Sequence, residues 1–208
     1  DSYDSAEYRK ELEASVRAAG NVVRNLGDAS KAIAGAAKTV TAEYYAPHLA
    51  HAPMEPPAAV ASVTADACEI WAPSQDPQSL IPMAEAITGL KPEQIRVNVT
   101  LLGGAFGRKS KCDFVEEAVY LSKQLAAPVL VQWSREDDIR HDYYHAVSAQ
   151  RLEAGLDESG AVTAWRHRAA YPSIMSTFDS AVREAALMET GMGAVNVPYA
   201  IPNLRFEV

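Results

Sequence analysis

The sequence predicts an α+β protein, with a two-layer unit in which helices cover one face of a mixed sheet, followed by a long antiparallel hairpin. Two observations predict this class. Between residues 58 and 133, short segments that alternate like strands are interspersed with segments of helical period. Residues 146–170 then form two long alternating segments around an Asp-Glu-Ser-Gly turn at 157–160. In order, the first part reads β-β-α-β-α-β, which packs into two layers.

Composition narrows the class of protein. The chain has 208 residues, enough for one domain with a core or for two small ones. Its net charge of −8 and pI of about 5.1 argue against nucleic acid as a partner. It lacks the continuous apolar run that a transmembrane helix needs, and residues 1–7 do not resemble a signal peptide. The chain starts as if cut from a longer one.

Residues 1–38 are predicted to form a helical linker region. Residues 6–26 have a helical period that places Tyr8, Leu12 and Val16 on one face, before Gly20 interrupts it. A capping sequence at 27–30 precedes a short alanine-rich helix. Residues 39–142 are then predicted as a first subdomain, whose opening strand covers residues 39–45.

The first subdomain continues with a proline loop and the regular elements. Residues 47–57 contain four prolines and are predicted to hold a fixed, irregular shape. The predicted elements after it are a hairpin (58–64 and 67–72), a helix from Pro77 to Gly89, a strand (95–101), a helix (113–125) and a strand (128–133). Residues 135–144 are interpreted as a charged structural loop that pairs Arg140 with Asp137 or Asp138.

Residues 143–208 are predicted to begin a second subdomain that is truncated. Its hairpin places Leu152 and Ala154 on one face, opposite Val162 and Ala164. Residues 171–192 are predicted as helix and loop, and residues 195–208 as extended chain.

A glycine loop in residues 101–113 is the most informative stretch. Gly103, Gly104 and Gly107 follow a strand, allow positive φ, and let a ligand approach backbone N–H groups. A helix starting at about Cys112 or Asp113 would direct its positive end toward the loop and favour an anion. The glycine spacing fits neither the P-loop nor the dinucleotide fingerprint.

Two interpretations of this loop remain open on spacing alone. In one it is a tight turn whose Arg108 and Lys109 are merely solvated, and in the other these two side chains bind an anion such as phosphate. Phe106, a large aromatic residue between glycines, favours a loop that wraps a ligand.

Other candidate groups give weaker signals. His51 and Glu55 in the proline loop suit acid/base chemistry or metal binding, but the favoured interpretation is that they bond to neighbouring backbone and hold the loop in place. Cys68 and Cys112 are predicted to be unpaired thiols. No Gly-x-Ser-x-Gly motif is present. His141, His145 and His167 are not expected to form a metal site built from protein side chains.

Four segments in the same order resemble the molybdenum-binding large subunits of the xanthine oxidase family. They are Ala-His-Ala-Pro-Met-Glu-Pro (50–56), Trp-Ala-Pro-Ser-Gln-Asp-Pro-Gln (71–78), Gly-Gly-Ala-Phe-Gly-Arg-Lys with Asp-Phe-Val (103–115), and Trp-Ser-Arg-Glu-Asp-Asp-Ile-Arg-His-Asp-Tyr-Tyr (133–144). The branch most resembled contains the isoquinoline 1-oxidoreductase β subunit and bacterial aldehyde dehydrogenases. The resemblance covers residues 27–208, and it makes residues 39–142 a molybdenum cofactor-binding subdomain.

The resemblance implies roles for particular residues. Gln75 matches a glutamine that hydrogen-bonds an oxygen ligand of molybdenum. Cofactor-binding positions match Gly103, Gly104, Ala105, Phe106, Gly107 and Arg108. Ala105 departs from a family glycine, which costs little if its φ stays negative. No metal ligand is expected from the protein, and the family's general-base glutamate has no match in these residues.

The resemblance also implies a cofactor, partners and a reaction. The expected cofactor is a molybdopterin, as the cytosine dinucleotide, with [2Fe-2S] clusters on a small partner subunit. The expected reaction oxidises an aldehyde or hydroxylates an N-heterocycle with water as the oxygen source. We expect the 208 residues alone to be inactive and to hold no cofactor. The location stays open between periplasm, which the resemblance favours, and cytoplasm.

Two alternatives remain. The chain could be a binding or assembly module without chemistry, or a phosphate- or nucleotide-binding domain that uses the loop from Gly103 to Lys109.

Overall fold

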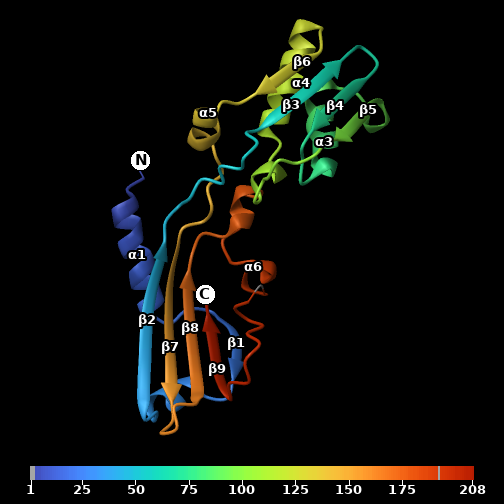
Figure 1. Ribbon diagram of the computed structural model, residues 1–208. Helices are drawn as coiled ribbons and strands as arrows, with labels where there is room; N and C mark the ends of the chain where they lie inside the picture. The colour runs from blue at the N-terminus through green and yellow to red at the C-terminus, as the bar shows by residue number, and fades with distance from the viewer. Residues whose placement is uncertain (1–2, 192) are drawn as a thin grey trace. The chain divides into compact units, whose positions relative to one another are not determined.

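The structure is a computed structural model that describes residues 3–191 and 193–208. The chain divides into two compact units. We call residues 50–145 the central unit, and residues 1–49 with 146–208 the terminal unit. Each unit has its own sheet (Figure 1).

The central unit contains a mixed four-stranded sheet in the order β5-β4-β3-β6. β4 and β5 are parallel, and the other neighbours are antiparallel. The strands are β3 (Ala58–Val63), β4 (Cys68–Ala72), β5 (Ile95–Val99) and β6 (Val129–Gln132). With α3 (Leu80–Thr88) after β4 and α4 (Asp113–Leu125) after β5, the predicted order β-β-α-β-α-β is confirmed.

Helices α3 and α4 pack on the sheet of the central unit and complete its core. Alternate residues of β3 and β4 are buried, as the two-residue period predicts. Asp76 caps the 3-10 turn η1 (Pro77–Ser79) that leads into α3, and Gly89 ends α3 with φ +77°. The core residues include Ala61, Ile70, Leu80, Ala84, Phe114, Val115, Ala118 and Val119.

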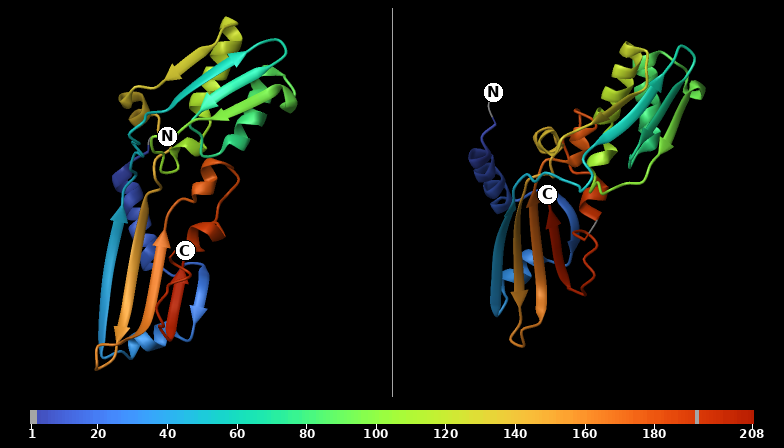
Figure 2. Two further views of the ribbon diagram at one scale, coloured as in Figure 1. Left: turned by 45° about the vertical axis from the view of Figure 1, so that its right-hand side comes forward. Right: turned by 45° about the horizontal axis from the view of Figure 1, so that its top comes forward.

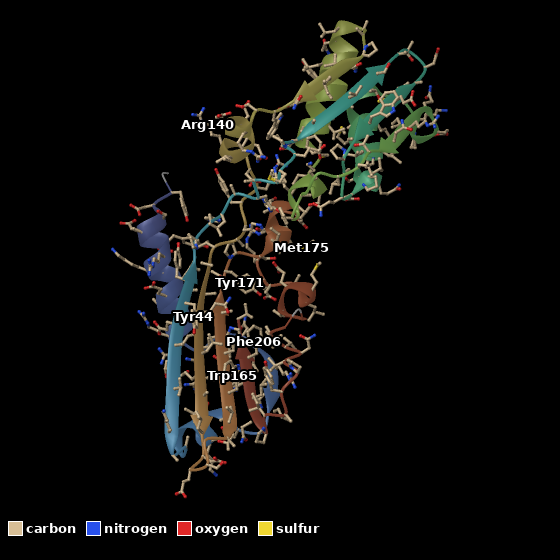
Figure 3. The ribbon with its side chains drawn as sticks, in the orientation of Figure 1. Tyr44, Arg140, Trp165, Tyr171, Met175 and Phe206 are labelled. Atoms are coloured by element: carbon tan, nitrogen blue, oxygen red, sulfur yellow. The ribbon has the colours of Figure 1, made fainter. Side chains whose placement is uncertain are left out.

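Residues 135–140 differ from the predicted charged loop, because they form the short helix α5 (Arg135–Arg140). Ser134 caps it by accepting a hydrogen bond from the Asp137 N–H at 3.1 Å. The helical spacing places Arg135, rather than Arg140, against Asp138. The predicted pairing of Arg140 is therefore wrong, and Arg140 is exposed on α5 (Figure 3).

The terminal unit has a five-stranded sheet in the order β1-β9-β8-β7-β2, with β1 and β2 at its edges (Figure 2). Its strands are β1 (Val22–Leu26), β2 (Lys38–Ala46), β7 (Ser148–Leu156), β8 (Val162–Ala170) and β9 (Asn203–Glu207). The predicted hairpin of β7 and β8 is present. Between β8 and β9 lie η4 (Ile174–Thr177) and α6 (Leu187–Gly191).

The N-terminal residues differ from the predicted linker. Residues 22–26 form β1 and pair with β9, and β2 pairs with β7 instead of opening the central sheet. The alternating pattern correctly predicts a strand at 39–45, but such a pattern does not specify which strand is the partner. The chain therefore returns to the sheet of its first residues only after the central unit is complete.

Helices α1 (Ser5–Arg17) and α2 (Ala29–Ala34) pack on β7 and β8. Leu12 and Val16 are buried, which confirms the predicted apolar face of α1. Gly155 lets α2 come close, since a Cβ there would lie 3.3 Å from the Ile33 Cα. Trp165 and Phe206 lie on the neighbouring strands β8 and β9 (Figure 3).

Glu43 links α1 to the sheet of the terminal unit. Its carboxylate pairs with Arg17 of α1 and with Arg151 of β7. Hydrogen bonds from Arg17 and Arg151 lower the pKa of Glu43 from 4.5 to about 2. Because the folded-state pKa is depressed, the carboxylate stabilises the unit above pH 4.5, and this contribution disappears as pH falls toward 2.

We therefore expect Glu43→Gln to lower the thermal unfolding midpoint at pH 6 and to have no effect near pH 2. Circular dichroism melts at a series of pH values measure this difference. A difference between the two proteins that is constant with pH would contradict the ionic role of Glu43.

Candidate functional site

The glycine loop, residues 103–107, has an unusual backbone. Gly104 and Gly107 have φ values of +94° and +104°, which favour glycine. Phe106 also has positive φ, at +58°, and 70% of it is exposed. A non-glycine residue in this region costs free energy, and such residues cluster at ligand sites. Ala105 is not among the positive-φ residues and is 3% exposed, so its methyl group is accommodated inside the unit.

Gln75 lies beside this loop. Gln75 lies between β4 and η1 in the sequence, and it is exposed. The Gly107 N–H donates to Gln75 Oε1 at 3.0 Å, and the Gln75 N–H donates to the Lys109 carbonyl at 2.9 Å. Because the amide oxygen accepts from Gly107, the amide NH₂ is the group that Gln75 offers to a ligand.

Glu55 holds the start of the loop. Its carboxylate Oε2 accepts from the Gly103 N–H at 3.0 Å, and its own N–H donates to the Gly103 carbonyl at 3.0 Å. A side chain at Gly103 is excluded because its Cβ would lie 2.5 Å from the Glu55 Cβ. The predicted bonding of the side chain to neighbouring backbone is confirmed for Glu55 but not for His51, whose ring bonds to the Asp142 carboxylate.

Arg108 is fully buried, so the interpretation that it is solvated is wrong. It pairs with both carboxylate oxygens of Asp113, at 3.0 and 2.8 Å. Its Nε lies 3.1 Å from Asp142 Oδ1, close enough for an ion pair, but this N–H has no aligned hydrogen-bond partner in the described residues. The guanidinium also lies over the rings of Trp133 and Tyr143.

Lys109 is fully buried as well, and its ammonium group pairs with Glu55. The positive end of α4 is matched by Asp113 and Glu116 in its first turn. The cations after the glycine loop and the helix terminus therefore have anionic partners inside the unit. The ligand-binding groups that remain at the loop are backbone N–H groups, the Gln75 amide and Phe106.

His51 belongs to the same buried network through Asp142. Its Nδ1 lies 2.9 Å from Asp142 Oδ1, and its ring lies 4.1 Å from the ring of His145. A Cβ at Gly107 would lie 3.6 Å from His51 Nε2, which places this ring beneath the loop. Among the described residues no group of three His, Cys, Asp or Glu residues is arranged to hold a metal ion.

Burial and the charges of this network shift three pKa values. Burial raises the pKa of Glu55, but the Lys109 ammonium and the Gly103 N–H outweigh it, so the net pKa is lowered. Burial raises the pKa of Asp138, one of whose oxygens has no hydrogen-bond partner within the described residues. Burial and the neighbouring His51 lower the pKa of His145.

Asp142 was not predicted to be part of the site, and Arg108 was predicted to bind a ligand or to be solvated. The only sequence signal for these buried ion pairs was the presence of Arg-Lys after the loop and of acidic residues in segments 50–56 and 133–144. Which carboxylate pairs with which cation depends on the fold. Of the other groups, Cys68 and Cys112 are free, and the described chain has no helix both long and apolar enough to cross a membrane.

A family model described as the molybdopterin cofactor-binding domain matches residues 14–208. The chain therefore belongs to this family, whose members bind their cofactor through a domain of this type.

Individual relatives agree with this assignment. The chain is 34% identical over 124 residues to the β subunit of isoquinoline 1-oxidoreductase from Brevundimonas diminuta, covering 59% of this chain and 16% of that protein. It is 27% identical over 194 residues to one subunit of the nicotinate dehydrogenase from Pseudomonas putida, covering 89% and 16%. The chain thus spans about a sixth of the length of these relatives.

Solved structures share the fold. The aldehyde oxidoreductase from Desulfovibrio gigas matches with a TM-score of 0.69 and 21% identity, over 90% of this chain and 20% of that one. The predicted fold class and the resemblance to the xanthine oxidase family are confirmed.

Proposed function

We propose that this chain is the part of a molybdenum hydroxylase large subunit that presents a molybdopterin to its substrate. The observation that supports this most is the Gln75 amide, whose oxygen is bonded to Gly107 and whose NH₂ remains available at the glycine loop. The isoquinoline and nicotinate enzymes among the relatives favour an N-heterocycle as the substrate, and an aldehyde dehydrogenase among them favours an aldehyde.

The loop fits a molybdopterin by its backbone. Gly104 and Gly107 allow a bound group to approach main-chain N–H groups, and neither carries a side chain that would fill the space. Phe106 and nearby apolar side chains suit a flat ring system, since Leu101 is 95% exposed and Met54 is 91% exposed. The cofactor, when bound, supplies the redox chemistry that amino acids lack.

The residues of this chain have positioning and hydrogen-bonding roles in the proposal. Gln75 donates its NH₂ to an oxygen ligand of the metal, and Gly104, Ala105, Phe106 and Gly107 form the wall that faces the cofactor. Gly103 and Arg108 act from inside, because Gly103 is bonded to Glu55 and Arg108 is buried in ion pairs. The general base and the iron-sulfur clusters are supplied by other residues or chains, and other residues bind the cytosine dinucleotide part of the cofactor.

The alternative of a nucleotide-binding domain loses its main support. It needs Arg108 and Lys109 to contact phosphate, but both are fully buried and paired with carboxylates. Turning either side chain toward a phosphate would break the ion pair of a fully buried cation, which is costly.

An isotope experiment tests the proposed reaction. The full-length protein is purified with its partner, its molybdenum content is measured, and it is given an aldehyde or an N-heterocycle with an electron acceptor in H₂¹⁸O. We expect the label in the carboxylate or ring hydroxyl of the product. A molybdenum-loaded protein that oxidises neither class, or whose product oxygen comes from O₂, would contradict the proposal.

A further inference from the structure

Glu55 contacts both ends of the segment from Gly103 to Lys109. At the first end it makes two hydrogen bonds with Gly103, one through its carboxylate and one through its backbone N–H. At the other end its carboxylate pairs with the ammonium group of Lys109. One side chain from the proline loop therefore contacts both ends of the segment from Gly103 to Lys109, which contains the glycine loop.

The backbone of Lys109 extends this contact to Gln75. The Lys109 carbonyl accepts the Gln75 N–H at 2.9 Å, and the side-chain oxygen of Gln75 accepts the Gly107 N–H at 3.0 Å. The Ser74 hydroxyl lies 3.5 Å from the same Lys109 carbonyl. The orientation of the Gln75 amide thus depends on Gly107 and Lys109. Both lie in the segment from residue 103 to residue 109, whose ends are bonded to Glu55.

We propose that Glu55 is a positioning residue that sets the distance between the glycine loop and the Gln75 amide. This inference rests on the proposed function, because it assigns Glu55 a role at the same site. Gly103 supports this inference independently, since a Cβ there would lie 2.5 Å from the Glu55 Cβ. Gly103 does not have positive φ, so the close contact with Glu55 explains why a glycine stands at this position. Lys109 needs the pair as well, because a fully buried ammonium group without a partner is costly.

Two double variants of the full-length protein separate positioning from simple stabilisation. Both carry Lys109→Met, which removes the buried charge. Glu55→Gln/Lys109→Met keeps an amide oxygen that accepts from Gly103, whereas Glu55→Ala/Lys109→Met has none. Glu69→Gln is the matched single control, because the Glu69 and Glu55 side chains are 40% and 37% exposed.

The first readout is hydrogen exchange of residues 103–107 without cofactor. We expect exchange in Glu55→Ala/Lys109→Met to be about tenfold faster than in Glu55→Gln/Lys109→Met, because one hydrogen bond is lost. The second readout is kcat and KM, measured separately in the loaded enzyme. We expect kcat of Glu55→Ala/Lys109→Met to be about tenfold to a hundredfold lower than that of Glu55→Gln/Lys109→Met, with KM nearly unchanged, because misplaced groups slow the reaction. The Glu69→Gln control is expected to match the unaltered protein in both.

Equal exchange and equal kcat in the two double variants would overturn the inference and make Glu55 a stabilising residue only. The isotope experiment is independent of this comparison. If the label reaches the product and the two variants still agree, the inference alone fails. If no oxidation occurs but exchange differs, the proposed function fails while the loop contact stands.

Discussion

Gln75→Ala in the loaded, full-length enzyme is expected to lower kcat by about a hundredfold to a thousandfold, the usual cost of removing one hydrogen-bond donor aimed at a reacting centre. The physical reason lies in the amide orientation. Gly107 fixes the oxygen of the side chain at 3.0 Å, so the NH₂ is held in place before a ligand arrives. Steady-state kinetics with an aldehyde or N-heterocycle measure the change.

Two controls separate the NH₂ group from general disturbance. Gln75→Glu keeps an oxygen for Gly107 but removes the donor, so it is expected to be as impaired as Gln75→Ala. Gln78→Ala, at an exposed position of η1, is expected to retain kcat. A Gln75→Ala enzyme with unchanged kcat and full molybdenum content would show that the domain is a binding or assembly module without this role.

Arg108→Met is expected to destabilise the central unit by about 3–5 kcal/mol, the range measured when one partner of a buried ion pair is removed. Arg108 is fully buried and its guanidinium faces the carboxylates of Asp113 and Asp142. Methionine fills part of the volume but leaves the buried Asp142 carboxylate without this cation. Urea unfolding followed by tryptophan fluorescence measures the free energy, because Trp71 and Trp133 both lie in the central unit.

Arg96→Met is the matched control for Arg108. The Arg96 side chain is 77% exposed, and its nearest carboxylate contact, with Glu69, is 3.8 Å long. Its loss is expected to change the free energy of unfolding by no more than about 0.5 kcal/mol, as for most surface substitutions. If the two variants unfolded at the same urea concentration, the arginine network beneath the loop would be unimportant for stability.

Local pattern was sufficient to predict the strands of the central unit and its helices α3 and α4, but not the short helix α5. The two-residue period of β3 and β4, the proline before α3 and the glycine after it are signals that act over a few residues. The same signals predicted α1, β7 and β8 in the terminal unit. They could not predict that β2 pairs with β7, because that choice depends on contacts between distant segments.

Some residues of the candidate site were likewise predictable from the sequence, and others were not. Gln75 and the glycine loop were proposed from motifs in which the residues themselves are distinctive, and the structure brings them within hydrogen-bonding distance. The roles of Arg108 and Lys109 were not predictable, since a cation in a loop has the same sequence signature whether it faces solvent, a ligand or a buried carboxylate. Only the fold shows that Glu55 and Asp142 reach these two residues.

We propose that residues 103–107 and the Gln75 amide together face the molybdenum of the cofactor. Anomalous X-ray diffraction from crystals of the loaded, full-length protein, collected at the molybdenum absorption edge, locates the metal directly. We expect a molybdenum peak beside the Gln75 NH₂ and the backbone of Gly104–Gly107. A peak that lies away from both groups would contradict it.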